Sequence, residues 1–186
     1  MLGDYINRGP DSRAVLDLLV KAKYELGDRL VLLRGNHEVA LLQMLTTGDA
    51  RAFLRHRGAT TIHSYLPHPG PDVLEDFRRG FPDDHLSLLK ATALWAEGQD
   101  LFISHAGYAQ DRPLSRAERD LTTGNWAALT QSKNHPRPLV VVGHYMQPSG
   151  QPFRSENLIG LDTGCGTVPS APLTALLFPE RTFRAY

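Results

Sequence analysis

Three short apolar runs each end on a polar side chain beside a glycine, and this feature constrains the fold more than any other in the sequence. The runs are RLVLLRGNH (29–37), DLFISHAG (100–107) and LVVVGH (139–144). Short apolar runs of this kind are typical of buried β-strands, and the carboxyl edge of an α/β sheet is where such folds build their sites. We therefore expect the strands to bring together the polar residues Asn36, His37, His105 and His144. Asp4 would join them if a strand precedes it.

Helical periodicity surrounds the first of these runs. Residues 10–26 predict a helix that begins at Asp11 or Ser12 and ends at Gly27. The face we expect it to bury is formed by Val15, Leu18, Leu19, Ala22 and Leu26. Helices and strands alternate and strands then dominate, with no internal repeat and no linker. The sequence thus predicts a single α/β domain over residues 1–186, with a mixed sheet or two sheets.

Composition argues against several classes of partner. Lys and Arg number 20, as do Asp and Glu, so the formal net charge is zero and favours neither nucleic acid nor an anionic membrane. The sequence has no apolar stretch long enough to span a bilayer. A single cysteine, Cys165, excludes an internal disulfide and predicts a cytoplasmic protein.

Asp4, Asn36, His105 and His144 form a mixed set of oxygen and nitrogen ligands. Such a set suits manganese, iron(II), zinc or a similar divalent ion. Taken singly, each residue is better explained as a turn, cap or packing residue. Their shared position beside glycine at a strand-to-loop junction favours a metal site.

Two arginines add a second signal. Arg8 and Arg34 lie inside glycine-bounded loops rather than on helix faces. A pair of guanidinium groups near a metal forms a fork-shaped receptor for a tetrahedral oxyanion such as phosphate. The alternative is that both arginines are solvated surface residues. That explanation suits most of the other basic residues of the chain better than it suits these two.

The motifs GDYINRGPDS, LLRGNHE, SHAG and VVGH, in this order, resemble those of the calcineurin-like metallophosphoesterases. More narrowly, they resemble the bacterial Ser/Thr phosphoprotein phosphatases, a family that also contains the symmetrical diadenosine tetraphosphatases. The resemblance extends over essentially the whole chain. It implies a sandwich of two mixed β-sheets flanked by helices.

The resemblance also implies a role for each motif residue. In the family, the aspartate corresponding to Asp4 bridges two metal ions, and the second ion is completed by the equivalents of Asn36, His105 and His144. His37 would act as general acid on the leaving oxygen, and Arg8 and Arg34 would hold the phosphate. Manganese is the expected metal, with iron or zinc as alternatives.

The implied reaction is hydrolysis of phosphomonoesters by a metal-activated water, with phosphoserine or phosphothreonine proteins as the leading substrate class. Two alternatives remain open at this point. One is a hydrolase of dinucleoside polyphosphates, and the other is a catalytically impaired module that binds a phosphate or a partner.

The family's opening motif, GDxHG, is absent from the sequence together with its strand. In the family this motif gives the first metal an aspartate and a histidine, so here that metal would keep Asp4 alone. Either an upstream segment exists in the cell, or this is a truly short protein. We expect the short protein to bind one metal and to hydrolyse phosphoesters slowly or not at all.

Asn7 is a second departure, because many relatives have aspartate there to orient the catalytic histidine. An amide can accept a hydrogen bond but carries no charge, so His37 is expected to titrate at lower pH than it would beside a carboxylate. The alternative is that Asn7 only forms a turn. No further phosphate-binding arginine can be assigned among Arg112, Arg116 and Arg119.

Overall fold

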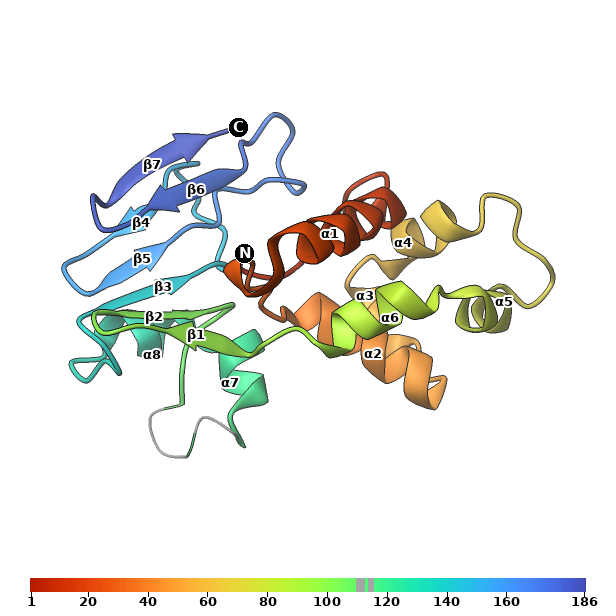
Figure 1. Ribbon diagram of the computed structural model, residues 1–186, viewed down its shortest axis with the longest axis horizontal. Helices are drawn as coiled ribbons and strands as arrows, with labels where there is room; N and C mark the ends of the chain where they lie inside the picture. The colour runs from red at the N-terminus through yellow and green to blue at the C-terminus, as the bar shows by residue number, and fades with distance from the viewer. Residues whose placement is uncertain (110–112, 114–115) are drawn as a thin grey trace. The chain divides into compact units, whose positions relative to one another are not determined.

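A computed structural model describes residues 1–109, 113 and 116–186. Contacts within the chain divide it into two compact units, residues 1 and 3–93, and residues 2 and 94–186. In Figure 1 the first unit runs from red to yellow-green and the second from green to blue. Each unit contains its own cluster of buried apolar side chains.

The first unit is helical. Its α-helices are α1 (Ser12–Leu26), α2 (Asn36–Thr47), α3 (Arg51–Arg55), α4 (Gly58–Tyr65), α5 (Val73–Gly80) and α6 (Asp83–Lys90), with a 3-10 turn η1 at Gly27–Arg29. They enclose a core in which Phe53 and Phe77 stack at 6.2 Å and Tyr65 meets Phe77 edge-on. Burying aromatic rings of this size is the main stabilising contribution within such a helical layer.

Helix α1 has the predicted ends but a different buried face. The Asp11 carboxylate caps it by accepting from the Ala14 N–H at 2.9 Å, and Gly27 ends it at φ 55°. Leu16 and Leu19 are buried, whereas Leu18 is 65% exposed. Apolar residues lie on more than one side of this helix, so periodicity alone could not fix which side faces the core.

Residues 29–33, predicted as a strand, are extended but form only an isolated bridge between Leu33 and Ala93. Backbone bonds link Leu33 N–H to the Met1 carbonyl at 3.0 Å and Ala93 N–H to the Leu32 carbonyl at 2.9 Å. The segment therefore has a partner on each side, but each pairing covers too few residues to form a regular strand.

The second unit contains the regular strands. They are β1 (Trp95–Glu97), β2 (Leu101–Ser104), β3 (Leu139–Val142), β4 (Phe153–Arg154), β5 (Leu158–Gly160), β6 (Thr174–Leu177) and β7 (Thr182–Ala185). Two short helices accompany them, α7 (Glu118–Thr122) and α8 (Trp126–Gln131). Strands β1 and β2 pair antiparallel on either side of Gly98.

A mixed sheet with strand order β1-β2-β3-β5-β4 forms the centre of this unit (Figure 1). Strands β2, β3 and β5 are parallel, with Ile103 opposite Val141 and Val141 opposite Ile159. All four residues of β3 are buried, as expected for a strand covered on both faces. The carboxyl ends of β2 and β3 therefore meet at one edge of the sheet.

Both faces of the mixed sheet are covered within the second unit. Phe102 and Val140 pack with Leu121 and Leu129 of the short helices. On the other face, Val141 packs in a cluster that includes side chains of β6 and β7. The prediction of an α/β fold with two sheets is confirmed, although the smaller sheet, β6-β7, is antiparallel rather than mixed.

Candidate functional site

The loop that carries the first motif has an uncommon backbone. Asp4, Asn7 and Arg8 adopt positive φ angles of 55°, 69° and 55°, and Gly3 precedes them at 91°. Positive φ is unusual outside glycine, and such residues cluster at functional sites because the surrounding structure must hold them there. The geometry therefore marks residues 3–8 as a loop held in place by its neighbours.

Glu38 is the group that holds this loop. Its fully buried carboxylate accepts the backbone N–H groups of Asp4, Tyr5 and Gly35, each at 2.8 Å. Burial and the nearby Asp4 carboxylate raise the pKa of Glu38 to about 7, while the three N–H donors act in the opposite direction. Glu38 thus ties the N-terminus of α2 to the loop.

Gly35 permits this close approach. A Cβ atom at this position would lie 2.7 Å from the Asp4 nitrogen and 2.9 Å from Glu38 Oε2. Its φ of −94° is ordinary, so the need for glycine is steric rather than conformational. With this close packing, the Asp4 carboxylate accepts the His37 N–H at 3.3 Å, at the positive end of the α2 dipole.

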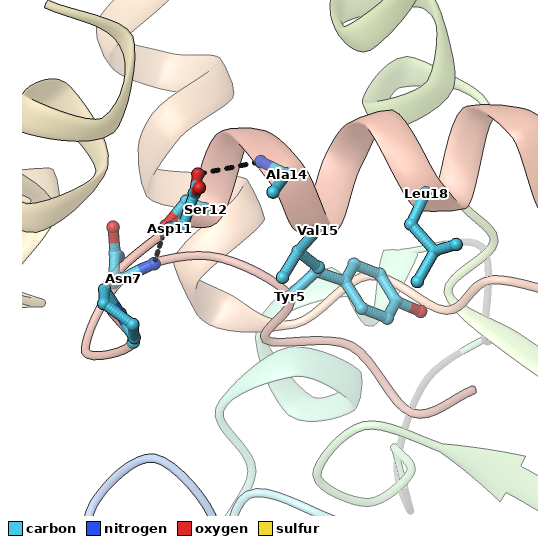
Figure 2. Close-up of a pocket in the computed structure, with 9 residues that line it drawn as sticks. Tyr5, Asn7, Asp11, Ser12, Ala14, Val15 and Leu18 are labelled. Carbon is cyan, nitrogen blue, oxygen red and sulfur yellow. Dashed lines mark hydrogen bonds between the residues drawn. The ribbon is translucent and has the colours of Figure 1, made fainter.

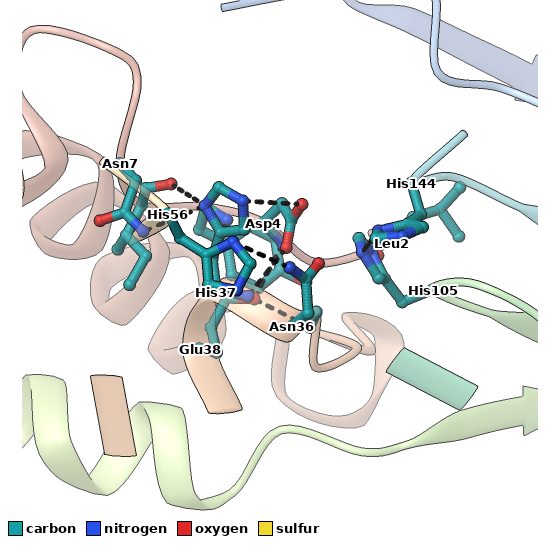
Figure 3. Close-up of polar contacts among 12 residues, drawn as sticks. Leu2, Asp4, Asn7, Asn36, His37, Glu38, His56, His105 and His144 are labelled. Atoms are coloured by element: carbon teal, nitrogen blue, oxygen red, sulfur yellow. Dashed lines mark hydrogen bonds and ion pairs between the residues drawn. The ribbon is translucent and has the colours of Figure 1, made fainter. Parts of the chain in front are cut away.

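His37 lies beneath the loop and is 1% exposed (Figure 3). Its Nε2 is 3.7 Å from Asp4 Oδ2, and its Nδ1 is 3.0 Å from Asn7 Nδ2 and 3.3 Å from the Ile6 carbonyl. Burial lowers the pKa of His37 to about 4, and the Asp4 carboxylate opposes that shift. The largest cause of the lowered pKa is desolvation of the ring, and the effect expected from Asn7 stays a prediction.

His56 is a neighbour of His37 that the sequence analysis missed. Its ring lies 4.9 Å from that of His37, and its Nδ1 is 3.4 Å from Asn36 Nδ2. The turn that presents it is tightly built: Arg57 has φ 62°, and a Cβ on Gly58 would meet the Phe53 ring at 2.7 Å. The contact directs the Asn36 amide nitrogen toward His56, so the amide oxygen points away from it.

The two predicted phosphate-binding arginines differ in their surroundings. Arg34 donates from Nε to Thr92 Oγ1 at 3.0 Å and from Nη2 to the Lys90 carbonyl at 2.9 Å. These bonds hold the C-terminal end of α6, where a cation is favourable. Arg8 is exposed at the tip of its loop. The structure thus gives Arg34 an anchoring role that the sequence analysis did not predict.

The second unit presents two histidines at the shared carboxyl edge of β2 and β3. His105 follows β2 directly, and His144 follows β3 after Gly143. His105 Nε2 lies 3.1 Å from His144 Nδ1, and His105 Nδ1 lies 2.6 Å from the Leu2 carbonyl. His144 has a positive φ of 60°. The prediction that neighbouring strands bring these two histidines together is confirmed.

This pair has the donor chemistry of a metal site. A carbonyl can only accept, so His105 Nδ1 carries the proton and its Nε2 presents a lone pair toward His144. Metal-binding histidines characteristically donate their second ring N–H to such a backbone carbonyl. Imidazole nitrogens of this kind suit manganese, iron or zinc.

The sequence matches the family model described as "Calcineurin-like phosphoesterase" over residues 1–171. The chain belongs to this family. The matched range contains the Asp4 loop, the Asn36–His37 pair and both strand-end histidines.

Two bacterial proteins are similar to this chain in sequence. A "Bis(5'-nucleosyl)-tetraphosphatase, symmetrical" from Delftia acidovorans is 34% identical over 107 residues, which cover 58% of this chain and 33% of that protein. A protein of the same description from an Acidovorax species is 33% identical over 134 residues, covering 72% of this chain and 41% of that one. The matched region therefore spans between a third and two fifths of these relatives.

A solved metallophosphoesterase from Sphaerobacter thermophilus is similar in structure. It is 15% identical, with a TM-score of 0.52, and the comparison covers all of this chain and 75% of that one. At this identity the likeness shows the fold alone.

Three further arginines could not be assigned as phosphate-binding from the sequence. Arg112 lies outside the described residues, and Arg116 and Arg119 are exposed. Among the described residues, no helix combines the length and apolar character needed to cross a membrane. His56 and Thr61 were missed in the sequence analysis. The HRGATT stretch that contains them has no motif that would mark either residue as functional.

Proposed function

We propose that this chain is a metal-dependent hydrolase of phosphoesters, in which Asp4, Asn36, His105 and His144 hold a divalent ion. The observation that carries the proposal is the His105–His144 pair, with Nε2 and Nδ1 facing each other at 3.1 Å. Asp4 is the second residue after Leu2, whose carbonyl binds His105. That stretch spans at most about 7 Å, which keeps Asp4 within reach of the pair.

The ion, for which manganese is the first choice, would polarise the phosphoryl group and lower the pKa of a bound water. Each protein group then has a task of its own. Asp4 would bind the ion, and Asn36 would do so through its amide oxygen, which points away from His56. Arg8, exposed at the tip of the loop, would pair with the phosphate oxygens and balance their negative charge.

His37 would assist departure of the leaving oxygen as a hydrogen-bond donor. Its ring is fixed on the Nδ1 side by Asn7, and Nε2 lies on the side of Asp4. A hydrogen bond from Nε2 to the leaving oxygen would favour bond cleavage. Arg34 would act mainly by holding its own segment against the end of α6. Its second role would be the direct phosphate contact that the sequence predicts.

The substrate class is the finer part of the proposal. The two tetraphosphatase relatives favour dinucleoside polyphosphates. The motif resemblance instead favours phosphoserine or phosphothreonine in proteins. The single cysteine, Cys165, supports action in the reducing cytoplasm.

A substrate panel with controlled metal content tests this proposal. The chain is assayed with Mn²⁺, and with a chelator, against diadenosine tetraphosphate, a phosphothreonine peptide and para-nitrophenyl phosphate. We expect Mn²⁺-dependent turnover, strongest on the dinucleotide, that is lost in Asp4→Asn. Turnover strongest on the peptide would favour the protein phosphatase. A folded chain that binds Mn²⁺ but hydrolyses none of the three would overturn the proposal and favour a binding module.

A further inference from the structure

A buried chain of hydroxyl groups lies behind the imidazole of His37. Thr61, from the first turn of α4, is 0% exposed, and Ser12, at the start of α1, is 2% exposed. Their oxygens are 2.9 Å apart, and Asn7 contacts both of them through its backbone N–H. Figure 2 shows Asn7 and Ser12 side by side at the start of the helix.

Thr61 also contacts the Asn7 side chain. Its Oγ1 lies 2.7 Å from Asn7 Oδ1, a separation typical of an O–H···O bond and short for N–H···O. Thr61 therefore donates its single hydroxyl proton to the amide oxygen. The hydroxyl of Ser12 in turn donates to Thr61 Oγ1, so each of these hydroxyl groups has an acceptor.

With the amide oxygen occupied by Thr61, the amide nitrogen of Asn7 faces the histidine. It lies 3.0 Å from His37 Nδ1 and can only donate, so Nδ1 must carry a lone pair. A neutral imidazole has one ring proton, which is then on Nε2. We infer that Ser12 and Thr61 are positioning residues: through Asn7, they hold His37 in the Nε2–H tautomer.

The Ile6 carbonyl makes this arrangement depend on Thr61. It lies 3.3 Å from His37 Nδ1, where it would accept a proton if Nδ1 carried one. Without the Thr61 hydroxyl, the Asn7 amide can rotate so that its oxygen also faces Nδ1. An Nδ1–H group would then have two acceptors, and the tautomer is expected to switch.

The importance of this tautomer for catalysis rests on the proposed function, in which the Nε2–H group donates a hydrogen bond to the leaving oxygen. The tautomer itself is measurable without any turnover. Long-range ¹H–¹⁵N correlations distinguish the protonated from the unprotonated ring nitrogen, and the His37 signals are assigned by their loss in His37→Gln.

We expect the Nε2–H tautomer in the wild-type chain, in buffer with Mg²⁺ at neutral pH, and the Nδ1–H tautomer in Thr61→Val. Thr61→Ser keeps a hydroxyl and should restore the wild-type pattern. Thr60→Val is the matched control, because Thr60 Oγ1 donates to the Arg57 carbonyl. Where turnover is present, Thr61→Val should lower kcat about tenfold with KM nearly unchanged, since a misplaced proton affects the transition state.

Two results would overturn the inference. One is an Nδ1–H or doubly protonated ring in the wild-type chain, which needs no variant to be seen. The other is an unchanged tautomer in a folded Thr61→Val chain. Absence of turnover on every substrate would count against the proposed function and leave the tautomer result standing.

Discussion

The His37→Ala variant is expected to lose about 10²–10⁴-fold in metal-dependent kcat, the usual contribution of a positioned proton donor. His37 is 1% exposed and held on its Nδ1 side by Asn7, so its Nε2 has one orientation in which to meet the substrate. The loss should be larger for phenyl phosphate than for para-nitrophenyl phosphate, because the poorer leaving group depends more on a hydrogen bond to its oxygen. Steady-state kinetics on the two esters measures both effects.

His63→Ala provides the control for this experiment, since that histidine is exposed on α4. It should retain wild-type kinetics on both esters. Equal losses on phenyl phosphate and para-nitrophenyl phosphate in His37→Ala would argue against a hydrogen bond from His37 to the leaving oxygen. Such a result would leave His37 as a residue that only shapes the site.

The Glu38→Ala variant is expected to lose about 3 kcal/mol of unfolding free energy or more. The change removes the shared acceptor of three backbone N–H groups, and each buried donor left without a partner costs about 1–3 kcal/mol. Water entering the space left by the side chain would recover part of this cost. Urea unfolding followed by circular dichroism measures the change.

Glu25→Ala is the matched control, because this glutamate is exposed on α1 and lies 3.9 Å from Lys21. Its removal should change stability by less than about 0.5 kcal/mol. Glu38→Gln keeps one acceptor oxygen and should fall between the two. A Glu38→Ala chain as stable as Glu25→Ala would show that the carboxylate does not hold the Asp4 loop.

The sequence predicted best those features that depend on local pattern. Helix α1 begins at Asp11 and ends at Gly27 as expected, because capping and positive φ depend on residue type. The polar residues after β2 and β3 were also predictable, since parallel strands must end at one edge of their sheet. The first feature follows from local backbone geometry, and the second follows from the way parallel strands pair.

The features that could not be predicted from the sequence depend on tertiary packing. His56 approaches His37, and Thr61 approaches Asn7, only because the segment from the end of α3 into α4 packs against the motif loop. The bonds by which Arg34 anchors the end of α6, more than 50 residues further along the chain, could not be predicted either, and its phosphate role stays a prediction. The buried face of α1 likewise depends on which of several apolar sides the rest of the unit covers.

Titration with Mn²⁺, followed by the electron paramagnetic resonance signal of the free ion, tests most directly whether Asp4, Asn36, His105 and His144 hold a common cation. We predict one Mn²⁺ per wild-type chain and unchanged binding in His63→Ala. Binding should be at least about tenfold weaker in Asp4→Asn and His144→Ala, because losing even a residue that only supports a ligand lowers metal affinity about 10–100-fold. Equal affinity in all four chains would contradict the account.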